Sequence, residues 1–95
     1  MPDFPQHLFR GEVRLFPQEG GWYYVAVPKK YTKLYGELAD RGLIPVTAQV
    51  GETQWNTSLL PKGDGTHFVA LKAHVRKCEG IELGDRIQVR FQVRG

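Results

Sequence analysis

Basic side chains form the most suggestive chemical pattern in this 95-residue sequence. Six of the thirteen lysine and arginine residues fall in two short segments, which hold Lys29, Lys30 and Lys33 and then Lys72, Arg76 and Lys77. Each segment begins where we expect a helix to start, and helix starts attract anions through backbone N–H groups that lack a partner within the helix. The six cations are therefore candidate anion-binding residues, and the competing interpretation is a solvated basic surface.

The order of charges in the first of these segments supports the anion hypothesis. Its cations come at the expected helix start, whereas Glu37 and Asp40 come at or beyond the end. The helix dipole favours the opposite order by roughly 0.3–1 kcal/mol per charge. A bound anion would offset this small electrostatic cost.

Aromatic residues suggest two further kinds of ligand. The candidate contacts for a small molecule are Trp22, Tyr24, Trp55 and His67. A nucleic acid would instead stack its bases on Trp22, Tyr24, Tyr31, Tyr35 and Trp55, beside the clustered positive charge. The competing interpretation is that these large side chains fill the core of a small domain.

Metal-binding and nucleophilic residues are few. His74 and Cys78 stand four residues apart and would share a helix face, but two ligands are too few for a structural zinc site, and we expect Cys78 to be buried. Ser58 lies in a predicted strand outside any G-x-S-x-G elbow, and Asp64 and Asp85 stand beside turn glycines, where a carboxylate caps the backbone. We therefore expect no metal, no cofactor and no enzymatic activity.

The overall composition indicates one soluble globular domain. The sequence is 41% hydrophobic and 24% charged, with a formal net charge of +3, which permits an anionic partner without requiring one. The single cysteine excludes an intrachain disulfide. Because no apolar run approaches the roughly 20 residues of a membrane helix and the start lacks signal-peptide features, we expect a cytoplasmic protein without membrane association.

An internal repeat organises the chain. A shift of 44 residues places 15–17 on 59–61, 25–27 on 69–71 and Gly36 on Gly80, and a one-residue slip then places 44–50 on 87–93. The repeat predicts two halves, 8–50 and 51–95, within one domain. Residues 1–7 have no counterpart and are expected to form a loosely held arm.

Each half shows the pattern strand, strand, helix, strand. Apolar and polar residues alternate around 9–15 and 55–59, glycine-containing turns follow at 17–21 and 61–65, and return strands are expected at 22–27 and 66–71. Short amphipathic helices fit 28–38, with Tyr31, Leu34, Tyr35 and Leu38 on one face, and 72–79, with Val75 and Cys78 on one face. Final strands at 43–50 and 86–93 complete a mainly β, six-stranded barrel with two short helices.

Two families carry a resemblance to this chain. The stretch 68–87, with Gly84-Asp85 after a short helix, resembles the swapped-hairpin barrels of the AbrB and MazE type, a double-split fold. Phe9-Arg10-Gly11, 21–28, 55–61, 65–67 and Gly84-Asp85 resemble an uncharacterised family, the domain of unknown function 1905. That resemblance implies a fold and a bacterial or archaeal origin, but it brings no established activity or site residue.

These patterns favour a small binding or accessory domain that recognises a small molecule, a peptide or a protein. The alternative is a nucleic-acid-binding barrel that uses the paired basic helix starts. Trp22, Trp55 and His67 stand where the two halves carry unlike residues. Specialised function is therefore expected where the halves differ, since the shared residues account mainly for the fold.

Overall fold

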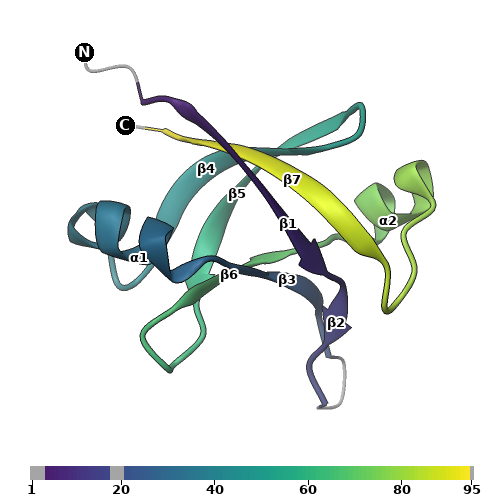
Figure 1. Cartoon of the computed structure of the whole chain (residues 1–95), viewed down its shortest axis with the longest axis horizontal. Helices are drawn as coiled ribbons and strands as arrows, with labels where there is room; N and C mark the ends of the chain where they lie inside the picture. Colours follow the sequence, from purple (N-terminus) through teal and green to yellow (C-terminus); the bar gives the residue numbers. More distant parts are fainter. Residues whose placement is uncertain (1–3, 18–20, 95) are drawn as a thin grey trace.

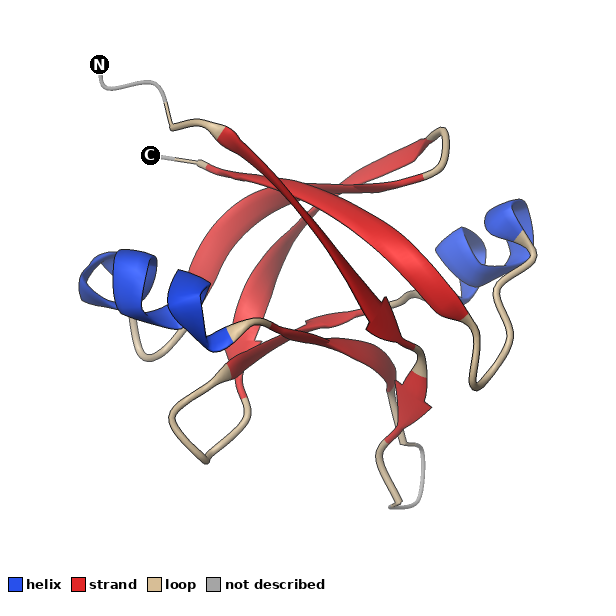
Figure 2. Ribbon diagram, in the orientation of Figure 1, coloured by secondary structure: helices blue, strands red, loops and turns tan. Residues whose placement is uncertain are grey.

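One curled antiparallel sheet makes up most of the computed structural model, which describes residues 4–17 and 21–94. The strand order is β1-β7-β4-β5-β6-β3-β2 (Figure 1). The strands are β1 (Gln6–Glu12), β2 (Arg14–Leu15), β3 (Tyr23–Val27), β4 (Ile44–Val50), β5 (Thr53–Pro61), β6 (His67–Ala70) and β7 (Arg86–Val93). Helix α1 (Lys29–Tyr35), extended by the 3-10 turn η1 (Gly36–Leu38), and helix α2 (Ala73–Glu79) lie on opposite sides of the molecule (Figure 2). The prediction of a mainly β, barrel-like fold with two short helices is confirmed.

The first predicted strand is divided, so the sheet has seven strands instead of the expected six. Residues 6–12 pair with β7, whereas residues 14–15 pair with β3. Val13 lies between them, fully buried, and its N–H donates to the carbonyl of Asp85 (2.7 Å). Since β1 and β2 are the two edges of the sheet and are consecutive in the chain, the bent segment 6–15 joins one edge to the other (Figure 1).

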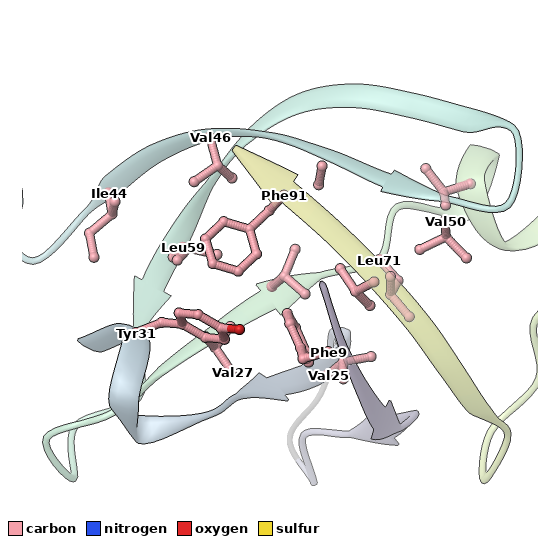
Figure 3. Close-up of a cluster of buried hydrophobic side chains, with 14 of the residues drawn as sticks. Phe9, Val25, Val27, Tyr31, Ile44, Val46, Val50, Leu59, Leu71 and Phe91 are labelled. Carbon is pink, nitrogen blue, oxygen red and sulfur yellow. The ribbon is translucent and has the colours of Figure 1, made fainter. Parts of the chain in front are cut away.

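The core lies inside the curled sheet. Alternate residues of β4, from Ile44 to Val50, point inward and are buried, as the period-two pattern requires. Ala48 lies opposite Phe91 of β7, so a small side chain leaves room for a large one. Figure 3 shows Phe91 meeting Phe9 and Tyr31 of α1 inside this space. Side chains, rather than a ligand cavity, therefore occupy the middle of the barrel.

The helices bury a narrower face than the sequence predicts. Tyr31 and Tyr35 of α1 are buried, but Leu34 and Leu38 are exposed. In α2 Val75 is buried, whereas Cys78 is exposed and the expectation that it belongs to the core is wrong. Helices of two turns present one narrow stripe to the sheet, so the positions on either side of that stripe remain in solvent.

The described part of the expected N-terminal arm is held more firmly than the sequence predicts. Gln6 and His7, placed by the sequence in a loose arm, are the first two residues of β1 and pair with β7. The side chain of Gln92 donates to the carbonyl of Phe4 (2.6 Å), and the His7 ring packs against Tyr31 (4.8 Å between centroids). Residues 1–3 of the expected arm lie outside the described residues.

Gly11 of β1 lies where the chain crosses close to β3. A Cβ at this position would lie 2.5 Å from Cγ1 of Val25, a fully buried and conformationally stiff side chain. The absence of a side chain at residue 11 therefore allows the bent segment to approach β3 closely.

We predict that Gly11→Ala lowers the free energy of unfolding by about 1–3 kcal/mol, because the added methyl group overpacks a rigid contact. The measurement is urea unfolding followed by circular dichroism. Gly36→Ala is the matched control, since its Cβ would meet nothing within 4 Å and its φ is −58°. Equal stability of Gly11→Ala and the unmodified protein would contradict the close-crossing argument.

We also predict a stability change in mildly acidic solution that depends on His7. Burial lowers the pKa of His7 in the folded protein, and the positive charge of Lys30 lowers it further. Burial also raises the pKa of Tyr35. The neutral ring of His7 therefore accepts a hydrogen bond at Nε2 from the hydroxyl of Tyr35. The unfolded chain binds the proton more tightly than the folded protein does. The contribution of neutral His7 to the free energy of unfolding is therefore complete above the ordinary histidine pKa of 6.5, and it declines as the pH falls below that value.

Urea unfolding between pH 5 and pH 7 tests this dependence. His7→Phe keeps an aromatic ring in the same place but cannot be protonated, so its stability is expected to change less with pH than that of the unmodified protein. An identical slope in both proteins would rule out His7 as a source of the pH dependence.

Candidate functional site

The six cations predicted from the sequence form two separate groups. Lys29, Lys30 and Lys33 are exposed on α1, and the other three lie on or just before α2, on the opposite side of the molecule (Figure 2). In the second group Arg76 is half-buried, whereas Lys72 and Lys77 are exposed. The structure therefore presents two distinct basic surfaces, of which the one at α2 includes a partly desolvated guanidinium group.

The aromatic candidates also lie in different places. Tyr24 is buried against Phe16, with the ring centroids 4.1 Å apart and the planes nearly parallel at 18°, and against Phe68. Trp55 is half-buried against the core, and no described group accepts a hydrogen bond from its indole nitrogen. Trp22 is 54% exposed. Of these three candidates, Trp22 is the one whose ring is free to contact a ligand.

His67 is a buried structural residue beside α1. Its Nε2–H donates to the carbonyl of Gly42 (2.8 Å), which fixes the tautomer because a carbonyl oxygen can only accept. The Nδ1 of the neutral ring then accepts from the hydroxyl of Thr32 (3.0 Å). Both ring nitrogens are therefore already bonded. His67 pairs with Val27 at the C-terminal end of β3, whereas Trp22 directly precedes the other end of that strand.

A cleft of about 470 Å³ lies between β5 and α2. It exists because β5 pairs with β6 only at Leu60 and Pro61, so the two strands diverge before α2 begins. The far end of α2 is tied back to β5, where the hydroxyl of Thr53 donates to Glu79 (2.5 Å). The residues that line this space, which we call the α2 cleft, include Trp22, Tyr23, Thr57, Leu60, Leu71, Lys72 and Arg76.

Arg76 is the most constrained polar group of the α2 cleft. Its guanidinium carbon lies 3.9 Å from the centroid of the Tyr23 ring, a cation–π contact, and its Nε donates to the carbonyl of Leu71 (3.2 Å). Among residues 4–17 and 21–94, no carboxylate forms an ion pair with this group. The terminal nitrogens of Arg76 are thus held in one orientation with donors available for a ligand.

The sequence predicts part of the α2 cleft. Trp22, Lys72 and Arg76 are among its candidate residues, whereas Tyr23 and Leu71 are not. The internal repeat contains a signal for Tyr23. A shift of 44 residues places Tyr23 on His67, and specialised function is expected where the two halves carry different residues. The apolar lining carries no such signal, since its residue types are those of any strand.

A second cleft of about 470 Å³ is lined by residues of both charge signs. Its lining includes Gln49, Glu79, Asp85 and Arg90 beside Ile81 and Ile87. Its carboxylates already have hydrogen-bond donors, from Thr53 to Glu79 and from the N–H of Glu82 to Asp85 (2.9 Å). This mixture of charges contrasts with the α2 cleft, whose charged lining is cationic.

The remaining chemistry-bearing residues have structural positions. Asp64 accepts hydrogen bonds from the hydroxyl and the N–H of Thr66, and the first of these lowers the pKa of Asp64. The predicted turn-capping roles of Asp64 and Asp85 are thus confirmed. Sγ of Cys78 lies 3.7 Å from Nδ1 of His74 on the exposed surface. Within the described ranges no three metal-ligating side chains gather together, and no helix is long and apolar enough to cross a membrane.

We predict that the α2 cleft surrounds Trp22 with positive potential, which can be measured by fluorescence quenching. In a Trp55→Phe background, where Trp22 is the sole tryptophan, the ratio of iodide quenching to caesium quenching at low ionic strength should exceed the ratio for free N-acetyltryptophanamide, because iodide is the stronger quencher even of free indole. Lys72→Gln should narrow the difference, while Lys33→Gln on α1 should leave it unchanged. A ratio equal to or below that of N-acetyltryptophanamide would show that the cleft is not electropositive.

Most of the chain matches a known protein family. No curated protein matches the chain. A family model described as a domain of unknown function, DUF1905, matches residues 9–91, a span that runs from β1 through both helices to β7 and includes every residue named above for the α2 cleft. The chain therefore belongs to the DUF1905 family.

Proposed function

We propose that this protein is a binding domain that holds a small organic molecule in the α2 cleft. The observation that carries the proposal is the placement of an exposed indole and a constrained guanidinium on one cleft of about 470 Å³. Ligand sites commonly combine an apolar lining with a few oriented polar groups in a space of this size. A cleft also fits a small molecule better than it fits an extended partner.

The charge and hydrogen-bonding groups of the cleft support recognition. Lys72 and Arg76 supply donors, and the hydroxyl of Thr57 supplies both a donor and an acceptor. Leu60 and Leu71 supply apolar surface beside them.

The wider architecture supports a second part of the proposal, that the barrel arose by internal duplication and is related to double-split barrels of the AbrB type. Helix α1 begins at Lys29 and helix α2 at Ala73, positions that the shift of 44 residues makes equivalent, and each helix has seven residues. Val25 of β3 pairs with Val69 of β6, residues that the repeat also makes equivalent. Such self-pairing of equivalent residues is what a twofold relation between the halves requires.

Fragment screening by two-dimensional ¹H–¹⁵N NMR tests the binding proposal. We expect a subset of small aromatic and aliphatic organic fragments to shift the amide signals of residues 21–23, 57–60 and 70–76. Trp22→Ala should weaken this binding about fivefold or more, since loss of a ring stack costs roughly 1 kcal/mol or more.

Leu34→Ala is the matched control, because Leu34 is 60% exposed on α1, away from the α2 cleft. A screen without shifts at the α2 cleft would overturn the proposal. Shifts on α1 and α2 together with a single-stranded oligonucleotide would favour the nucleic-acid-binding alternative instead.

A further inference from the structure

We infer that the ligand of the α2 cleft is an aromatic anion, a planar ring that carries a carboxylate or a phosphate group. This inference rests on the proposed function and specifies its ligand class. The anionic group would bind Arg76 and Lys72, and the ring would lie against Trp22 and its apolar neighbours.

The state of Arg76 argues for an anion. A half-buried guanidinium group has lost part of its hydration, and such groups are usually paired with a carboxylate. Within the part of the chain that the structure describes, the carbonyl of Leu71 accepts a hydrogen bond from Nε, and no hydrogen bond or ion pair engages the two terminal nitrogens. The remaining donors form the planar fork that matches two oxygens of a carboxylate or phosphate.

The ring of Tyr23 strengthens this argument by fixing the fork. The contact at 3.9 Å places the guanidinium over the face of the ring, so the group is oriented before a ligand arrives. Side-chain ordering is then largely complete in the free protein, which lowers the entropic cost of binding. Lys72, exposed at the same cleft, adds a second positive charge.

The apolar side of the cleft argues for a planar ring on the ligand. Trp22 exposes 54% of its surface even though indole is among the most favourable groups to bury. Leu60 and Leu71 line the same space. An anion without a ring would leave the exposed indole of Trp22 in water, whereas a flat aromatic group would cover it.

The internal repeat relates two corners of the barrel, one beside α2 that holds Arg76 and Tyr23, and one beside α1 that holds their counterparts. A shift of 44 residues replaces Arg76 by Thr32 and Tyr23 by His67, and there the two side chains bond to each other at 3.0 Å. The second nitrogen of His67 is bonded to Gly42. At one corner the paired positions satisfy their own hydrogen bonds, and at the other they leave a cation with free donors.

Matched probes separate the ligand class from binding itself. Benzoate and benzamide have nearly the same shape, but one is charged and the other neutral, and phenyl phosphate tests the second oxyanion. Titrations of the full chain followed by ¹H–¹⁵N NMR should give a dissociation constant for benzoate or phenyl phosphate at least about tenfold below that of benzamide, as expected for a charged hydrogen bond. The tighter of the two anions identifies the preferred oxyanion.

Substitutions test the assigned residues. Arg76→Gln should reduce the preference for the anion to about twofold or less, and Arg76→Lys should restore part of it, because lysine keeps the charge without the planar fork. Lys72→Gln, at an exposed position that does not endanger folding, should weaken anion binding about two- to fivefold by removing one nearby charge. Lys33→Gln on α1 is the control and should have no effect.

The outcomes distinguish the two proposals. Binding of benzamide as tight as that of both anions, with shifts confined to the α2 cleft, would overturn the aromatic anion and leave the binding domain standing. Absence of cleft shifts with all three probes would overturn the aromatic anion, and absence of shifts across the fragment screen would overturn the binding domain as well.

Discussion

The fold depends on one crossing, where β1 passes close to β3 at Gly11 and the chain then bends at Val13. Before the bend the segment pairs with β7, and after it with β3, so a single segment meets both edges of the curled sheet. Val13 and Val25 are fully buried at this point. Edge strands expose unpaired backbone groups, and a segment that joins both edges protects much of each. The inward faces of β4 and β7 then enclose a filled core.

Much of this architecture follows from local pattern. The alternation from Ile87 to Val93 identifies β7, and the glycine at residue 80, which ends α2 with a left-handed φ of 63°, is what such a helix end requires. The division at Val13 does not follow from local pattern, because alternation continues through residues 9–15 whichever strand is the partner. Pairing partners are a property of the assembled sheet. For the same reason Gln6 and His7 carry no sequence signal of their pairing with β7.

The site is predictable in part for a related reason. The repeat identifies Lys72 and Arg76 as a basic group, and it also suggests a symmetric group on α1. The repeat contains no information on how deeply each side chain is buried, so it cannot distinguish the half-buried Arg76 from the exposed Lys77. The stacking of Arg76 on Tyr23 joins residues that are distant in the sequence, and a pattern in one segment does not reveal it. The divergence of β5 from β6, which opens the cleft, likewise depends on the sheet as a whole.

The hydrogen bonds of His67 have a consequence for how the two corners can evolve. Replacement of His67 or Thr32 leaves a buried or half-buried polar partner without a bond, which carries a cost in stability. Replacement of Trp22 or Lys72 changes an open surface and leaves the fold's own hydrogen bonds intact. Mutational tolerance is therefore unequal within one small barrel. One corner is constrained to preserve the scaffold, and the other is free to drift toward new ligands.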